Sequence, residues 1–184
     1  MTIDLSGSGM LAITRDALSA LRAALERDTG PAAAGYLQEA GYAGGGALFD
    51  AFRRWLASRG VGEPESLPVE VFQQESAEFF RRAGWGSLQV GALHDMVATL
   101  DSSDWGEAAP ESALEQPGCH LSAGMFADFF GRVADAPLAV MEVECRSAGA
   151  DRCRFLLGST DVMQAVYEQM SQGAGYADAV GASA

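Results

Sequence analysis

The placement of three cysteines constrains this chain more than any other feature of its sequence. Cys145 and Cys153 are eight residues apart and flank the turn of a predicted strand–turn–strand, so a hairpin would bring the two thiols close together. Cys119 opens a predicted helix upstream, and its thiol can approach from outside the hairpin. Three thiols suit zinc, which prefers four tetrahedral N, S or O ligands. Three separate buried cysteines that act as small hydrophobes are equally compatible with this spacing.

A fourth zinc ligand would have to come from a residue near these thiols. Glu142, Glu144 and His120 are all candidates by position, and spacing alone does not separate them. A disulfide framework fits poorly, because an odd number of cysteines leaves one unpaired.

The charge balance excludes several classes of function. The chain of 184 residues has 12 basic and 25 acidic residues and a net charge of −13. Binding to nucleic acid or to an anionic membrane requires a cationic surface, so we expect neither partner. The chain has no lysine, which excludes Schiff-base chemistry on that residue. Dinucleotide-binding, P-loop and nucleophile-elbow motifs are absent from the sequence, which favours a binding role over catalysis.

Hydropathy predicts where the protein resides. Hydrophobic residues make up 48% of the chain, enough to bury a core, yet no apolar run reaches the roughly 20 residues that span a bilayer. Residues 1–10 lack the basic and apolar regions of a secretory signal. We therefore expect a cytoplasmic protein.

The first 83 residues are predicted to be helical. Apolar spacing indicates helices over residues 16–27, 31–40, 48–56 and 68–83, with a stop at Gly41 and a hinge at residues 44–46. The third helix has a bulky apolar face formed by Phe49, Phe52 and Trp55. This face exceeds what a short helix needs to dock once, so we predict a homodimer built from the N-terminal helices.

Short strands and further helices are predicted after residue 84. The strands cover residues 88–93, 96–100, 137–144 and 154–157, and the helices cover 119–133 and 161–170. Residues 101–118 form a long polar excursion that could act as a lid. The order of elements predicts an α+β fold with N-terminal helices followed by a mixed antiparallel sheet with helices. We expect one compact domain, with a helical part at 1–83, a zinc-bearing part at 84–172 and a flexible tail at 173–184.

The second half of the chain, from about Phe79 to Gly158, resembles the 4-vinyl reductase domain family. The resemblance rests on four segments: Gly84-Trp85-Gly86, Cys119 to Gly124, Glu142 to Gly149, and Cys153-Arg154-Phe155. The pattern of a cysteine, then Glu-x-x-Cys, then a glycine-containing turn and a last cysteine is specific to that family. The implied fold is the one shared by haem nitric-oxide sensor domains and subunits of the TRAPP vesicle-tethering complex.

The resemblance also implies the metal ligands. In zinc-binding members of the family, the positions of Cys119, Glu142, Cys145 and Cys153 supply the ligands, which favours Glu142 over Glu144. Four protein ligands close the shell, so the zinc is expected to be structural. Glu142 and Cys145 would face opposite sides of a regular strand, so a bulge or an early strand end is required.

Residues 25–52 weakly resemble the sensor domain of phenol- and xylene-responsive transcriptional activators. The resemblance implies a small aromatic ligand in a cavity between the helices and the sheet. Candidate contacts are Trp105, His94, Trp85 and Phe126, although core packing accounts for each of them equally well. The activators continue into an ATPase and a helix-turn-helix domain, so we expect a separate effector protein to deliver any output here.

The leading hypothesis is therefore a sensor or carrier for a small hydrophobic, aromatic ligand. Two alternatives stay open: a role in tetrapyrrole metabolism, on bacteriochlorophyll precursors, and a scaffold that binds no ligand.

Overall fold

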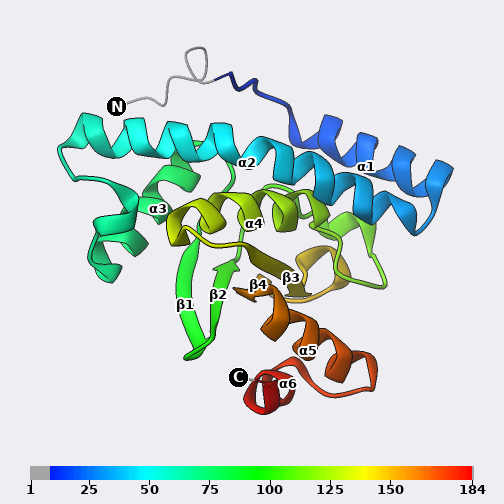
Figure 1. The fold of residues 1–184 in the computed structure, drawn as a ribbon. Coiled ribbons are helices and arrows are strands. Elements are labelled where there is room, and N and C mark those ends of the chain that lie inside the picture. The colour runs from blue at the N-terminus through cyan, green and yellow to red at the C-terminus, as the bar shows by residue number, and fades with distance from the viewer. Residues whose placement is uncertain (1–8, 184) are drawn as a thin grey trace.

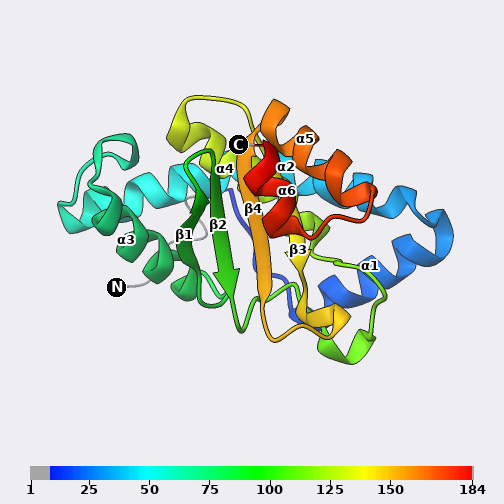
Figure 2. The same cartoon turned by 90° about the horizontal axis from the view of Figure 1, so that it is seen from below.

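The computed structural model describes residues 9–183, which form helices on both faces of a four-stranded sheet (Figures 1 and 2). The helices are α1 (Arg15–Thr29), α2 (Ala32–Arg59), α3 (Val69–Arg82), α4 (His120–Ala134), α5 (Thr160–Ser171) and α6 (Tyr176–Ser183). The strands are β1 (Gln89–His94), β2 (Val97–Ser102), β3 (Leu138–Glu144) and β4 (Cys153–Ser159). All neighbouring strands are antiparallel, in the order β1-β2-β4-β3, and the predicted α+β class is confirmed.

One long helix, α2, replaces the two helices predicted between residues 31 and 56. The predicted stop at Gly41 and hinge at residues 44–46 are wrong, because α2 runs unbroken through this glycine-rich stretch. Gly41 and Gly45 are buried against α4, and a Cβ atom on either would collide with that helix. Glycine is required here for the close approach of two helices and does not break the chain's helical path.

An aromatic core fills the space between the helices and one face of the sheet. Its rings are Phe49, Phe52, Trp55, Phe79, Phe80, Trp105, Phe126, Phe129, Phe130 and Phe155, all buried. The rings of Phe80 and Phe129 lie 5.2 Å apart, and those of Phe126 and Phe155 also lie 5.2 Å apart. The helical part and the sheet therefore share a single core.

The apolar face of α2 does not remain open to a second copy of the chain. Phe49, Phe52 and Trp55 are covered by α3 and α4 of the same chain, with Phe52 against Phe79 at 5.2 Å and against Phe129 at 5.5 Å. The dimer contact predicted for this face is therefore wrong. A homodimer would need a different surface.

The other face of the sheet is covered by α5 and α6 (Figure 2). Val97 and Leu156 of the sheet pack with Met163 and Val166 of α5 and with the buried Ala179 and Val180 of α6. The flexible tail predicted at 173–184 is thus corrected for Tyr176–Ser183, because small residues in this helix have an apolar surface to bury against. Ala184 lies outside the described residues.

The excursion at 101–118 begins in the core. Trp105 is fully buried, Glu107 is buried, and the Ala109 N–H donates to the Ser147 hydroxyl at 2.9 Å. The Leu114 N–H also donates to the Ser147 carbonyl, at 2.7 Å. The lid predicted for this segment is wrong, since its indole and carboxylate are part of the interior.

Within residues 9–183, no helix combines the length and hydropathy needed to cross a membrane. The expectation that the chain lacks a secretory signal concerns mainly residues 1–8, which lie outside the described residues.

Candidate metal centre and ligand cavity

Four side chains converge at the end of the sheet where β3 and β4 meet the start of α4. One donor atom from each of Cys119, Glu142, Cys145 and Cys153 lies within 4.8 Å of all the others. The Cys119 Sγ lies 3.8 Å from the Cys145 Sγ and 3.9 Å from the Cys153 Sγ. Zinc–sulfur bonds of about 2.3 Å in a tetrahedron place two sulfurs roughly 3.8 Å apart. These four residues could therefore hold a metal ion with little rearrangement.

Local backbone features bring the four side chains to one point. Cys119 is the N-cap of α4, and Cys153 is the first residue of β4. The pairing of β3 with β4 shifts register between Glu142 and Glu144, and β3 ends before Cys145. This bulge and strand end let Glu142 and Cys145 face the same side, which a regular strand would not allow.

The Glu142 carboxylate has one oxygen engaged and one free. Its Oε2 accepts a hydrogen bond from the Cys119 N–H at 2.8 Å, whereas the buried Oε1 has no partner among the described residues. Burial, and then the nearby Cys145 sulfur, raise the pKa of Glu142 to about 8. An unpaired carboxylate oxygen in the interior is costly unless a cation or a proton satisfies it. The free oxygen is thus placed for metal coordination.

The three thiols interact so strongly that they do not titrate independently. Hydrogen bonds with the thiols of Cys119 and Cys153 lower the pKa of Cys145 far below its usual range, and the hydrogen bond with Cys145 is the main cause that raises the pKa of Cys119. The backbone at Gly118 and the Ser147 hydroxyl further stabilise a Cys145 thiolate. Three thiolates and a carboxylate in one interior site repel one another, and a divalent cation would offset that repulsion.

The other two candidate ligands lie outside this cluster. Glu144 accepts hydrogen bonds from the Arg152 guanidinium at 2.8 and 3.1 Å and from the Tyr176 hydroxyl at 2.5 Å. His120 is partly buried beside Arg22 and Glu26, and burial lowers its pKa. The register of β3 therefore separates Glu142 from Glu144, which the spacing of the residues could not do.

Glu107 organises the start of α4 and was missed in the sequence. Its carboxylate accepts hydrogen bonds from the Leu121 N–H at 3.0 Å, the Ser122 N–H at 2.7 Å and the Ser122 hydroxyl. Burial raises the pKa of Glu107 to about 7 despite these bonds. The buried Arg22 donates to the Glu107 carbonyl at 3.3 Å. No local capping motif announces this contact, because Glu107 lies 12 residues before the helix N-cap.

The four predicted ligand contacts have different environments. Trp105 and Phe126 are core residues whose rings lie 5.1 Å apart, and the Trp105 indole N–H donates to the Ser122 hydroxyl at 2.7 Å. Trp85 stacks on Trp105 at 5.4 Å, with an interplanar angle of 18°, and is the member of the set that lines a cavity. His94 is exposed at the end of β1, in the β1–β2 hairpin. The structure thus brings three of the four together and leaves His94 apart.

An apolar cavity of about 350 Å³ lies between the N-terminal segment, α2 and α4. Its walls are Met10, Leu11, Ala12, Ile13, Thr14, Arg15, Leu18, Ala40, Gly41, Gly44, Leu48, Ala83, Gly84, Trp85, Gly106, Leu121 and Met125. Residues 10–15, which no sequence motif singled out, form one side of it. The small residues on α2 and around Trp85 leave the space that larger side chains would occupy.

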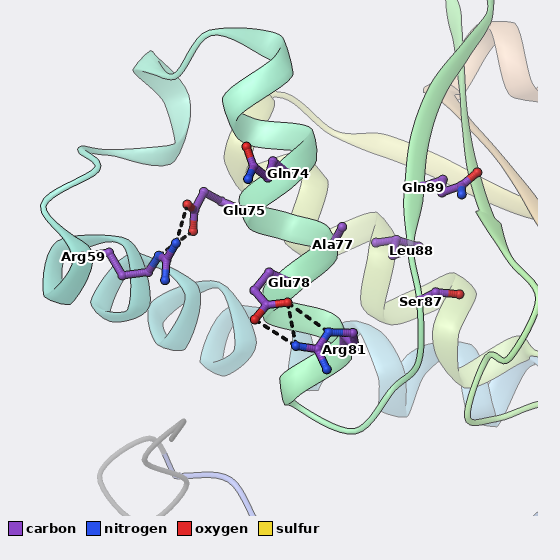
Figure 3. Close-up of a pocket in the computed structure, with 9 residues that line it drawn as sticks. All are labelled: Arg59, Gln74, Glu75, Ala77, Glu78, Arg81, Ser87, Leu88 and Gln89. Carbon is purple, nitrogen blue, oxygen red and sulfur yellow. Dashed lines mark hydrogen bonds and ion pairs between the residues drawn. The ribbon is translucent and has the colours of Figure 1, made fainter. Parts of the chain in front are cut away.

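Two further depressions differ in chemistry. Figure 3 shows a groove of about 500 Å³ between α3 and the start of β1, where Arg59 pairs with Glu75 at 2.9 Å and Arg81 with Glu78 at 2.8 Å. These charges already satisfy one another. A groove of about 790 Å³ runs along β3 between α4 and α5, and Glu142 is one of its walls.

The fold and the cysteine–carboxylate cluster together define a class of α+β domains with a candidate metal centre at one end of the sheet. Residues 106–159, which contain all four cluster residues, match the vinyl-4-reductase domain family, and the resemblance expected from the cysteine pattern is confirmed. The chain is 27% identical over 78 residues to an uncharacterized protein, MJ0745, of Methanocaldococcus jannaschii, a match that covers 42% of this chain and 41% of that one. The match therefore spans about two fifths of the curated relative's length.

Two solved structures share the fold. The phenol-responsive sensory domain of the transcription activator PoxR, solved with phenol, superposes with a TM-score of 0.61 at 17% identity, over 84% of this chain and 78% of that one. A vinyl-4-reductase family protein from Methanocaldococcus jannaschii has a TM-score of 0.50 at 22% identity, over 68% of each chain. At these identities the comparison establishes the fold, including its helical N-terminal half.

Proposed function

We propose that this protein is a small-molecule-binding domain, of sensor or carrier type, whose hydrophobic ligand occupies the apolar cavity beside Trp85. The observation that carries the proposal is the cavity itself. Its volume of about 350 Å³ falls in the range typical of ligand pockets, which are apolar with few polar groups. Trp85 offers an aromatic wall that is already fixed by its stack on Trp105.

The comparisons support a binding role in two ways. A phenol-responsive sensory domain shares this fold, and its name identifies a small aromatic compound as what it detects. The vinyl-4-reductase family match covers the part of the chain that supports the cavity from below, including Leu121 and Met125. An aromatic ligand is therefore the first class to test.

We also propose that the metal is zinc and that its role is structural. Three thiolates and one carboxylate are a donor set that zinc accepts, and four protein ligands would leave no coordination position for a substrate. When bound, the ion would supply a cross-link between the start of α4 and the β3–β4 turn. The Cys119 N–H would hold the Glu142 carboxylate in position.

Two variants on α2 test the ligand site. A Cβ on Gly44 meets no atom within 4 Å, and this residue lines the cavity, so Gly44→Leu should fill the space without disturbing the helix. Gly35→Leu is the matched control, because Gly35 is an exposed residue of the same helix, also with open space around it and away from the cavity.

The experiment is a thermal-shift screen of phenols, alkylbenzenes, fatty acids and porphyrins. A ligand at a hundredfold excess over its Kd stabilises the folded state by about 2.7 kcal/mol, which moves the melting temperature by several degrees. We expect hits that Gly44→Leu abolishes and Gly35→Leu preserves. A flat screen would support the scaffold alternative, and a hit confined to porphyrins would support a tetrapyrrole role.

A further inference from the structure

The polar groups of the cavity are few and carry one sign of charge. Thr14 and Arg15 are the cavity walls with polar side chains, and no carboxylate is among the walls that the described residues form. This composition is unusual for a chain with 25 acidic and 12 basic residues. A positive charge at the rim of an apolar cavity selects the head group of a ligand more than it stabilises the fold.

Arg15 is not committed to an ion pair within the described part of the chain. The ion pairs found there, to within 4.0 Å, involve other arginines. Asp104, whose charge interacts with Arg15, is already engaged, since its Oδ1 accepts hydrogen bonds from the Ser87 N–H at 2.7 Å and from the Ser87 hydroxyl at 2.5 Å. The Arg15 donors are therefore available to a ligand.

The position of Arg15 directs it at the cavity. A Cβ built on Gly106, another cavity wall, would lie 3.5 Å from the Arg15 Nε, so the guanidinium lies beside this wall. Arg15 is also the first residue of α1, whose first-turn N–H groups have no intrahelical acceptor and favour negative charge. The Thr14 hydroxyl accepts from the Ala17 N–H at 3.2 Å and fixes this turn. The guanidinium and the helix start thus favour an anion at the same rim.

We propose that the cavity takes an amphipathic carboxylate, with its apolar body against Trp85 and Leu48 and its carboxylate on Arg15. This proposal rests on the proposed function and adds the chemical class of the ligand. A guanidinium binds a carboxylate through paired N–H donors, which a neutral hydroxyl cannot match. The net charge of −13 repels anions in general, so retention of a carboxylate would depend on this local cation.

The test compares two probes of nearly equal shape, phenylacetate and 2-phenylethanol, by isothermal titration calorimetry on the full chain. We expect phenylacetate to bind roughly tenfold more tightly at low salt, and the preference to weaken as salt is added. Arg15→Met should remove the preference by weakening phenylacetate alone. Arg27→Met is the control, because Arg27 lies at the far end of α1, paired with Asp28 at 2.8 Å, and should change neither affinity.

The outcomes separate this proposal from the proposed function. If the two probes bind wild-type protein equally, or if Arg15→Met leaves the preference intact, the carboxylate assignment is overturned while the cavity stays a ligand site. If neither probe binds and Gly44→Leu alters no hit of the thermal-shift screen, the cavity is not a ligand site and both proposals fail. Because Arg15 is exposed, its substitution should leave the melting temperature of the free protein unchanged, which verifies folding in each arm.

Discussion

Gly41 of α2 lies directly against the main chain of α4, so close that a Cβ on it would be 1.9 Å from the Leu121 carbonyl oxygen. Gly124 of α4 makes the reciprocal approach, where a Cβ would be 1.9 Å from the Gln38 carbonyl oxygen. The two helices therefore touch through backbone at two points. This contact sets the position of α4, which carries Cys119 at its start and the cavity walls Leu121 and Met125 along its length.

We predict that Gly41→Ala destabilises the protein by about 3 kcal/mol, because the added methyl group can fit only if the helices separate. The free energy of unfolding in urea measures the effect. Gly44→Ala, on the same helix, places its methyl group in open space and should be neutral or stabilising by up to about 1 kcal/mol. Equal stability of the two variants would contradict the close contact.

Glu107 predicts a dependence of stability on pH. Its pKa is about 7 in the folded protein and 4.5 ordinarily, so between these values the folded state keeps a proton that the unfolded chain releases. The contribution of Glu107 is thus complete below about pH 4.5, falls as pH rises through about 7, and is constant above that. The predicted loss is on the order of 3 kcal/mol, at 1.36 kcal/mol for each unit of pKa difference.

The measurement compares the free energies of unfolding of wild-type protein and Glu107→Gln across pH 4 to 9. Comparison at each pH cancels the titration of the other groups, which the two proteins share. The advantage of wild type over the variant should shrink with rising pH inside the stated window. A difference that stays constant from pH 4 to 9 would show that Glu107 does not titrate there.

Much of the architecture was predictable because it depends on local periodicity. Apolar spacing gave α1, α3, α4 and α5 and all four strands to within a few residues. The cysteine pattern gave the residues that the structure brings together. These features are encoded by neighbours in the sequence or by a motif that a family shares.

The missed features depend on contacts between distant segments. The glycines of α2 indicate a break when their only context is the sequence, and their role is visible only with α4 beside them. Glu107 caps a helix across a loop, and residues 10–15 line a cavity whose opposite wall begins at residue 40. Composition likewise described residues 173–184 as a flexible tail, because the apolar surface that orders α6 belongs to other strands and helices.

The packing of α6 leads to a third prediction. Val180 is buried against the sheet and α5, so Val180→Asp should destabilise the protein by about 3 kcal/mol, because it places an unpaired charge in an apolar cluster. Ala182→Asp, on the exposed side of the same helix, should change the free energy of unfolding by less than about 0.5 kcal/mol. Chemical denaturation of both variants gives the comparison, and an unaffected Val180→Asp would mean that the helix contributes nothing to stability.

The last prediction concerns the metal centre, where β3 offers two glutamates two residues apart. Glu142 has a buried, unpartnered oxygen beside the three sulfurs, whereas both oxygens of Glu144 are bound by Arg152. Glu142→Gln should therefore weaken zinc binding by about a hundredfold, and Glu144→Gln should leave it unchanged. Cys145→Ser should abolish tight binding, because it removes a thiolate from the shell, and His120→Ala should have no effect. Competition with a chromophoric chelator at fixed pH measures each affinity, and elemental analysis gives the expected ratio of one zinc per chain. Zinc loss should also lower the melting temperature, since binding free energy of a structural ion adds to folding free energy. If Glu142→Gln retains wild-type affinity while His120→Ala loses it, the fourth ligand is His120, and if a folded, chelator-free preparation contains no metal, the cluster is not a metal centre.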